Sequence, residues 1–367
     1  MKIKAPSHIE SLVPYPPGKP LEELEREYGI TGSIKLASNE NPWGPSPKAV
    51  EAIAAALSGL HRYPDGSCYY LNHALAENLG VHSDEIVLGN GSNEIIGFLV
   101  TAFMRPGEEV ITSHPSFLMY QKFVQVQGGV NRVVELKEMC HDLDGIVARI
   151  NDKTRLIFLD NPNNPTGTYI GTEEFAAFLA KVPEGVLVVL DEAYVDFVEP
   201  GERIDTFSYI HGDKPVVALR TFSKAYGLAG LRLGYGVMKR EIAGYLHRVR
   251  QPFNVNSLAQ SGGIAALSDA EYYSKTLSKT REQREWLMQA VAGLGCRPLP
   301  SHTNFFLIDV GGSGKKLYEQ MLYKGVIIRP MEAYGYPDYI RITVGIPAEN
   351  QRFIRALAET LTELGYV

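Results

Sequence analysis

The sequence predicts an α/β protein, with a three-layer α-β-α large domain around a mainly parallel sheet and a smaller α+β C-terminal domain. Two observations predict this fold. Short apolar runs alternate with helical patterns up to about residue 250, which is typical of βαβ units. Beyond that point, a long helical stretch is followed by further strand patterns and a last helix. We expect an N-terminal arm at 1–40, a large cofactor-binding domain at 41–250 and a small domain at 251–367.

The elements are expected in a simple order along the chain. Several prolines make the arm irregular, apart from one short amphipathic helix at 21–28. Apolar runs predict five strands of the large domain, at 85–88, 109–112, 155–159, 186–190 and 216–219. Helical patterns lie at 47–57 and 93–103, and then at 258–294 with an interruption near Ser268. The small domain is expected to hold strands at 304–310, 325–329 and 339–344 and a helix at 347–364.

Composition excludes several classes of protein. Of the 367 residues, 45% are hydrophobic and 21% are charged, which is ordinary for a soluble globular protein. The net charge of -6 argues against a nucleic-acid partner, because such proteins usually present a basic face. Three scattered cysteines without a CxxC pair favour neither disulfides nor a metal site. Because no apolar run approaches the roughly 20 residues of a membrane span, we expect a cytoplasmic protein without membrane partners.

Three of the predicted strands end in polar clusters. These clusters are 160–167, 191–194 and 220–224. In open α/β sheets the ligand crevice lies beyond the carboxyl ends of the strands. We therefore expect all three clusters to face one pocket.

The side chains of these clusters suit an aldehyde cofactor with a pyridine ring. Lys224 could form a Schiff base with the aldehyde, and Asp191 could keep the pyridine nitrogen protonated. Tyr194 and Asn164 could donate hydrogen bonds to a phenolate oxygen on the same ring. These residue types together match pyridoxal 5′-phosphate.

A phosphate site is also predicted beside the lysine. Ser223 and Arg232 have the hydrogen-bonding capacity and charge that a phosphate requires. Residues 91–93 open a helix directly after a strand, where free backbone N–H groups and the helix dipole favour an anion.

Each of these residues, taken alone, has a simpler explanation. A lysine after a strand is most often a surface residue, and Asp191 could merely cap the next helix. Residues 161–167 are ordinary turn chemistry. Gly89 and Gly91 lack the third glycine of a dinucleotide-binding motif, and no glycine loop continues as a P-loop. Only the combination is specific.

Several motifs resemble those of the fold-type I pyridoxal-phosphate aminotransferases, essentially from end to end. Within that family, the arm and the Arg62-Tyr63-Pro64 motif are most similar to the histidinol-phosphate aminotransferases. The motifs that carry the resemblance are Pro14-Tyr15-Pro16-Pro17-Gly18-Lys19-Pro20, 37–45, Arg62-Tyr63-Pro64-Asp65-Gly66, 161–167, Asp191-Glu192-Ala193-Tyr194, 223–232 and Arg341-Ile342-Thr343-Val344-Gly345.

The resemblance implies a role for each matching residue. Lys224 is implied to hold the cofactor covalently and to carry the proton, and Asp191 to pair with the ring nitrogen. Asn164 and Tyr194 are implied to contact the ring oxygen, and Phe117 to stack on the ring. The residues implied to bind the cofactor phosphate are Gly91, Ser92, Asn93, Thr221, Ser223 and Arg232, with Tyr63 reaching it from a neighbouring subunit. The active unit is therefore expected to be a homodimer.

Substrate recognition is implied to centre on Arg341. Its guanidinium would clamp an anionic group of glutamate or of histidinol phosphate. Four further residues are implied to line the substrate side, namely Arg329, Tyr15, Asn39 and Tyr120.

The resemblance implies a transaminase of histidine biosynthesis that passes the amino group of glutamate to imidazole-acetol phosphate. An aromatic amino-acid aminotransferase is the nearest alternative, because the same motifs occur in enzymes for phenylalanine or tyrosine. A decarboxylase of an amino-acid phosphate would use the same fold. A non-enzymatic regulator is disfavoured, because few residues precede the first motif and a DNA-binding module would not fit there.

Overall fold

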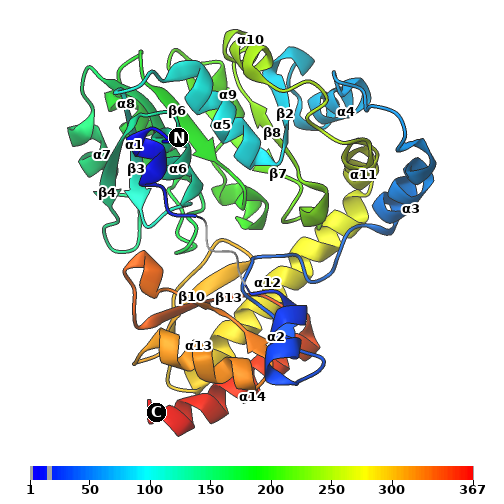
Figure 1. Ribbon diagram of the computed structural model, residues 1–367, viewed down its shortest axis with the longest axis vertical. Coiled ribbons are helices and arrows are strands. Elements are labelled where there is room, and N and C mark those ends of the chain that lie inside the picture. Colours follow the sequence, from blue (N-terminus) through cyan, green and yellow to red (C-terminus); the bar gives the residue numbers. More distant parts are fainter. Residues whose placement is uncertain (1–2, 15–18, 367) are drawn as a thin grey trace.

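A seven-stranded sheet forms the centre of the larger part of the molecule (Figure 1). The computed structural model describes residues 3–14 and 19–366. The strand order is β2-β8-β7-β6-β5-β3-β4. Neighbouring strands are parallel except at β8, which runs antiparallel to both β2 and β7. The strands are β2 (Ile86–Asn90), β3 (Glu109–His114), β4 (Val130–Glu135), β5 (Thr154–Asp160), β6 (Leu187–Asp191), β7 (Val216–Thr221) and β8 (Leu233–Val237).

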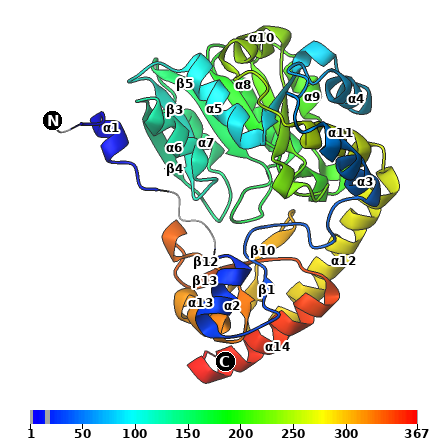
Figure 2. The same ribbon diagram turned by 45° about the vertical axis from the view of Figure 1, so that its right-hand side comes forward.

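Helices cover this sheet on both faces, as Figure 2 shows. Along β6, Val188 and Leu190 enter one hydrophobic core, whereas Leu187 and Val189 enter the other. Helices α4 (Tyr69–Leu79), α7 (Leu143–Arg149), α8 (Thr172–Lys181), α9 (Thr206–Ile210) and α11 (Ser257–Leu267) supply the first core. Helices α5 (Ser92–Phe103), α6 (Met119–Val126) and α10 (Arg240–Val249) supply the second. The predicted three-layer α-β-α arrangement is confirmed.

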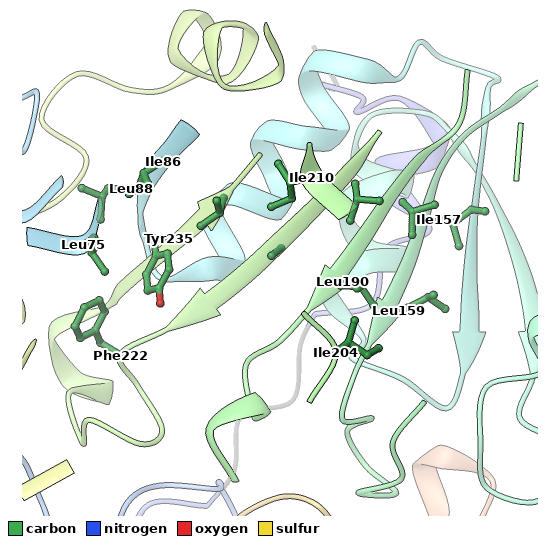
Figure 3. Close-up of a cluster of buried hydrophobic side chains, with 14 of the residues drawn as sticks. Leu75, Ile86, Leu88, Ile157, Leu159, Leu190, Ile204, Ile210, Phe222 and Tyr235 are labelled. Carbon is green, nitrogen blue, oxygen red and sulfur yellow. The ribbon is translucent and has the colours of Figure 1, made fainter. Parts of the chain in front are cut away.

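Residues of the first core lie close to the carboxyl ends of the strands. Figure 3 shows Leu159 and Leu190 side by side from β5 and β6, with Phe222 and Tyr235 farther along the sheet. Phe222 is fully buried and directly precedes Ser223 and Lys224. Packing of this ring therefore anchors the segment that follows β7.

A second, smaller sheet lies below the first in Figure 1. Its strand order is β12-β13-β10-β9, and all neighbours are antiparallel. The strands are β9 (Arg297–Pro298), β10 (Phe305–Asp309), β12 (Arg329–Pro330) and β13 (Tyr339–Thr343). Helices α12 (Ala270–Gly293), α13 (Gly314–Tyr323) and α14 (Pro347–Leu364) pack around its core. In both ribbon views α12 extends from the end of α11 to this sheet.

The N-terminal residues contact both parts of the molecule. Near α1 (Ser7–Glu10), the Gln125 side-chain amide on α6 donates to the His8 carbonyl oxygen at 3.1 Å. Leu24 on α2 (Leu21–Tyr28) is buried in a cluster with side chains of the small-sheet region. Strand β1 (Ile34–Lys35) then pairs in parallel with β11 (Val326–Ile327). The chain has thus bridged the two sheets before it reaches α3 (Pro47–Ala56).

Two strands of the large sheet, β4 and β8, were absent from the prediction, and the single strand expected at 325–329 is two short strands in different sheets. Strand β8 lacked an apolar run because it contains Gly234 and Gly236. A Cβ at position 234 would lie 2.1 Å from the Ser92 backbone nitrogen. Only glycine lets the first turn of α5 lie this close to the sheet.

Across residues 3–14 and 19–366, no helix has both the length and the apolar character that crossing a bilayer requires.

We expect Gly234→Ala to destabilise the protein by about 1–3 kcal/mol, because the added methyl group meets backbone atoms that cannot rotate away. Gly244→Ala on α10 is the matched control. A Cβ there meets no atom within 4 Å, so removing a helical glycine should stabilise the protein by about 0.5–1 kcal/mol. Urea unfolding of both variants measures the difference, and equal stabilities would contradict the close approach of α5 to β8.

Candidate active site

A cavity of about 460 Å³ lies at the carboxyl ends of β5, β6 and β7. Lys224, Asp191 and Asn164 line it from the large sheet, while Arg329 and Arg341 line it from the small sheet. The three polar clusters therefore converge, and residues of the second sheet close the same space.

Asp191 is the last residue of β6 and is almost completely buried. The Tyr120 hydroxyl donates to its Oδ2 at 2.8 Å, and the Ala193 N–H donates to its Oδ1 at 3.2 Å. Burial raises the pKa of Asp191 to about 7, although the Tyr120 hydrogen bond works in the opposite direction. A protonated heterocycle nitrogen beside this carboxylate would relieve that cost, since the two charges compensate each other.

Lys224 places its amine inside the same cavity. Burial, followed by the positive charge of Arg341, lowers the pKa of Lys224 to about 8. Its Nζ donates to the Ser38 carbonyl oxygen at 3.3 Å and lies 5.6 Å from the centre of the Tyr194 ring. A substantial fraction of this amine is therefore neutral near physiological pH, which is the form that attacks an aldehyde and accepts a proton.

Two residues flank the space next to Lys224. The Tyr194 hydroxyl accepts a hydrogen bond from Asn39 Nδ2 at 2.9 Å, and burial raises the pKa of Tyr194 to about 12. Asn164 Oδ1 accepts from Arg341 Nη1 at 2.5 Å. Because Tyr194 keeps its proton, it can donate a hydrogen bond to an anionic oxygen in the cavity.

The end of the cavity that lies beside Arg232 and the start of α5 is suited to an anion. Arg232, in a left-handed backbone conformation with φ 58°, lies beside Ser223, with Nη1 and Oγ 3.5 Å apart. The guanidinium approaches the start of α5 so closely that a Cβ at Gly91 would lie 2.7 Å from Arg232 Nη2. Asn93 Oδ1 is buried there and accepts no hydrogen bond from the described part of the chain. A positive charge, a hydroxyl and a helix N-terminus thus surround one point.

Arginines from neighbouring strands line the small-sheet side. Arg341 on β13 and Arg329 on β12 are register partners. Arg341 is buried, its Nη2 donates to the Ala37 carbonyl oxygen at 2.9 Å, and its guanidinium carbon lies 5.1 Å from the Phe305 ring centre. These contacts hold a planar donor group at the cavity wall, where it suits a carboxylate or a phosphate.

Most of the predicted site residues come together here. Those that line the cavity are Asn39, Ser92, Asn93, Phe117, Tyr120, Asn164, Asp191, Tyr194, Thr221, Ser223, Lys224, Arg232, Arg329 and Arg341. Gly91 directly precedes α5 and forms its N-cap.

Tyr63 and Tyr15 are not among these residues, and Tyr120 lines the cavity with its hydroxyl already bonded. Tyr63 is 83% exposed, stacks on Phe253 and does not line the cavity of its own chain, so its expected role at a neighbouring subunit stays a prediction. Tyr120 was expected to contact substrate, but its side chain is fully buried and its hydroxyl is committed to Asp191. Tyr15 lies outside the described residues.

Asp160 and Tyr334 are among the cavity residues to which the prediction gave no role. Asp160 lines the wall next to Asp191, and it ends a strand in a cluster that the sequence did mark as polar. Tyr334 lines the small-sheet side from a short turn after β12. Tyr334 is buried, and no pattern in the sequence distinguishes it from the other tyrosines of the chain.

Comparison with known proteins places this site in a family. Residues 31–357 match the family model of aminotransferase class I and II. A histidinol-phosphate aminotransferase of Desulfotalea psychrophila is 62% identical over 370 residues, which cover 100% of this chain and 98% of that protein. The chain belongs to the histidinol-phosphate aminotransferase family. A histidinol-phosphate aminotransferase of Moorella thermoacetica is 46% identical, over 96% of this chain and 92% of its own length.

Solved structures agree with that assignment. A histidinol-phosphate aminotransferase of Sinorhizobium meliloti in complex with pyridoxal-5′-phosphate is 31% identical, with a TM-score of 0.91 and 99% of both chains covered. An L-threonine-O-3-phosphate decarboxylase of Porphyromonas gingivalis is 26% identical, with a TM-score of 0.79 over 90% of this chain and 99% of that one. The fold is thus shared by transaminases and by a decarboxylase, as the sequence led us to expect.

Proposed function

We propose that this chain is a pyridoxal 5′-phosphate-dependent histidinol-phosphate aminotransferase. It would exchange an amino group between glutamate and imidazole-acetol phosphate, giving 2-oxoglutarate and histidinol phosphate. The observation that carries this proposal is the placement of the Lys224 amine, the Asp191 carboxylate and two arginines around one cavity. Membership of the histidinol-phosphate aminotransferase family supports the choice of substrate.

The residues present fit this cofactor. The unpartnered Asn93 Oδ1 and the crowded approach of Arg232 to Gly91 mark the phosphate end of the cavity. Asp191 supplies a negative charge for the ring nitrogen, and Tyr194 and Asn164 lie where they could contact the ring oxygen. When bound, the cofactor supplies the electron sink that stabilises a carbanion at the substrate Cα.

The chain itself supplies proton transfer and orientation. Lys224 Nζ would remove a proton from the substrate Cα and deliver it to the carbon of the cofactor that carries the aldehyde, which its lowered pKa permits near neutral pH. The Asp191 carboxylate holds the proton on the ring nitrogen. Phe117 lines the cavity beside Tyr120 and would hold the ring from one face.

Two arginines match the charges of the proposed substrates. Glutamate carries two carboxylates, and histidinol phosphate carries a phosphate. Arg341 and Arg329, paired across adjacent strands, would bind these anions in turn. Asn39 would orient the substrate from a position beside β13, where its N–H donates to Thr343 Oγ1 and its side chain donates to the Tyr194 hydroxyl.

We further propose a cytoplasmic homodimer. Several exposed large hydrophobic residues lie in the segment 57–70 that contains Tyr63, the stacking partner of Tyr63 is also exposed, and exposed apolar surface is typical of protein interfaces. These residues are Leu57, Leu60, Tyr63, Tyr69, Tyr70 and Phe253. A second subunit covering this surface could receive Tyr63 at its cofactor phosphate.

The substrate assignment is tested by kcat/KM for histidinol phosphate, phenylalanine and tyrosine, with 2-oxoglutarate as acceptor. We expect histidinol phosphate to be preferred by at least about 100-fold, because only this substrate offers the arginines a phosphate. A tenfold preference for an aromatic amino acid would instead support the alternative transaminase. Release of CO₂ without formation of glutamate would indicate a decarboxylase.

A further inference from the structure

Behind Asp191, a buried chain of three polar side chains leads away from the cavity. Ser113 Oγ lies 2.6 Å from His141 Nδ1. His141 Nε2 lies 3.0 Å from the Asp160 carbonyl oxygen and 3.3 Å from Asp160 Oδ1. All three residues are buried, and the proposed reaction assigns none of them a task.

This Ser-His-Asp chain is not a nucleophile. Ser113 is completely buried inside β3, so its hydroxyl cannot meet a substrate. His141 Nε2 faces two oxygen acceptors and therefore carries a hydrogen. Of these three side chains, only Asp160 lines the cavity. Any effect of the three on the site must therefore pass through Asp160.

The groups that surround the Asp160 side chain are hydrogen-bond donors. Asn163 Nδ2 donates to its Oδ1 at 3.1 Å, and the Asn164 N–H donates to its Oδ2 at 2.9 Å. His141 Nε2 lies 3.3 Å from Oδ1, while its hydrogen bond goes to the Asp160 carbonyl oxygen, so both the side chain and the backbone of Asp160 are held in place. Asp160 and Asp191 are register partners on β5 and β6, so two acidic side chains lie next to each other at this end of the cavity.

The charged and titratable groups around Asp191 show which of them acts on it. Tyr120 donates a hydrogen bond from α6, and Glu192 is paired with Arg220 at 2.8 Å, which compensates much of its charge. Asp160 is held by amides and by His141. Burial is the main reason that the pKa of Asp191 is raised, and the negative charge of Asp160 raises it further.

We propose that Asp160 is a positioning residue whose negative charge, held in place by His141, strengthens the hold of Asp191 on a protonated ring nitrogen of the cofactor. This inference rests on the proposed function, because it requires the cofactor in the cavity. It gives the ring-nitrogen end of the site two carboxylates, of which Asp191 makes the contact and Asp160 acts through Asp191.

The test starts from protein without bound cofactor and compares how tightly it binds two different cofactors. Pyridoxal phosphate has a ring nitrogen that can be protonated, whereas its 1-deaza analogue has a C–H group in that place. Asp160→Asn removes the charge and keeps the shape of the side chain. We expect the Kd of pyridoxal phosphate to rise about tenfold in this variant, and the Kd of the deaza analogue to change less than about twofold. The ¹⁵N signal of the bound, labelled ring nitrogen should also move toward its unprotonated position.

Equal weakening of both cofactors would overturn the inference, because it would show that Asp160 only shapes the 161–167 turn. An unchanged Kd for both would overturn it as well. Asp160→Ser, which removes the charge with a smaller side chain, gives the same comparison should the Asn variant not fold. His141→Gln keeps the carboxylate charge and should change the Kd of pyridoxal phosphate by less than about threefold. If the unaltered protein bound no pyridoxal phosphate, the proposed function would fail instead.

Discussion

Replacing Lys224 with alanine is expected to reduce transamination by at least about 1,000-fold, because the variant loses both the amine that captures the cofactor and the base that moves the proton. The visible absorbance of the cofactor bound through this amine should disappear. Substrate turnover and absorbance spectra measure the two effects. Normal turnover in Lys224→Ala would rule out the proposed mechanism.

The same variant tests where Tyr63 acts. Tyr63→Ala should weaken cofactor binding and lower activity. If Tyr63 reaches the site of the other subunit, a mixed dimer of Lys224→Ala and Tyr63→Ala chains contains one intact site. Random remixing of equal amounts should then restore about a quarter of the normal activity. Activity no greater than the average of the two separate variants would place Tyr63 outside the partner's site.

Asp191→Asn is expected to have opposite effects on activity and on stability. Transamination should fall by about 100-fold to 1,000-fold, because a neutral amide does not hold the ring nitrogen in its protonated form. The cofactor-free variant should nevertheless be more stable than the unaltered protein at pH 8, by about 1–3 kcal/mol.

The direction of this change in stability follows from the pKa of Asp191. Folding raises the pKa of Asp191 from 3.8 to about 7, so the folded chain binds this proton more tightly than the unfolded chain does. The free energy of unfolding therefore falls as the pH rises from about 4 to about 7 and stays low above that range. Because Asn carries no charge at any pH, the free energy of unfolding of the variant does not fall in this way.

Urea unfolding of the cofactor-free protein between pH 4 and pH 8 measures the difference. The two curves should meet near pH 4 and separate toward pH 8. Asp213→Asn, at an exposed position, controls for the general effect of removing an acidic group. If the free energies of unfolding of the unaltered protein and of Asp191→Asn changed in parallel with pH, burial of this carboxylate would not destabilise the protein.

The sequence predicted the layers of the fold because buried parallel strands leave plain apolar runs. Helix 347–364 was predicted with the bounds of α14, because Pro347 begins it and Gly365 follows it. Strand β8 escaped prediction, since Gly234, which the approach of Ser92 requires, and Gly236 carry no apolar signal. The boundaries at residues 40 and 250 stay predictions.

The site was predictable where polar residues directly follow an apolar strand and suit the same cofactor. Lys224, Asp191 and Asn164 are of this kind, and the cavity contains all three. The hydrogen-bond partner of Tyr120 was not predictable, because a tyrosine on a helix gives no sign of whether it faces a substrate or a neighbouring carboxylate. Asp160 was overlooked because its effect depends on its register with Asp191, which only the paired strands reveal.

The contacts of the arm also bear on how the protein is made. The Asn39 N–H donates to Thr343 Oγ1, a residue 304 positions later, and Ile34 pairs with Val326. During synthesis, residues 34–39 leave the ribosome long before their partners on β11 and β13 do. Such distant contacts form late, because a long loop must close before they contribute. A nascent chain can therefore build the large sheet with Lys224 and Asp191 in place and still lack the wall that shelters them.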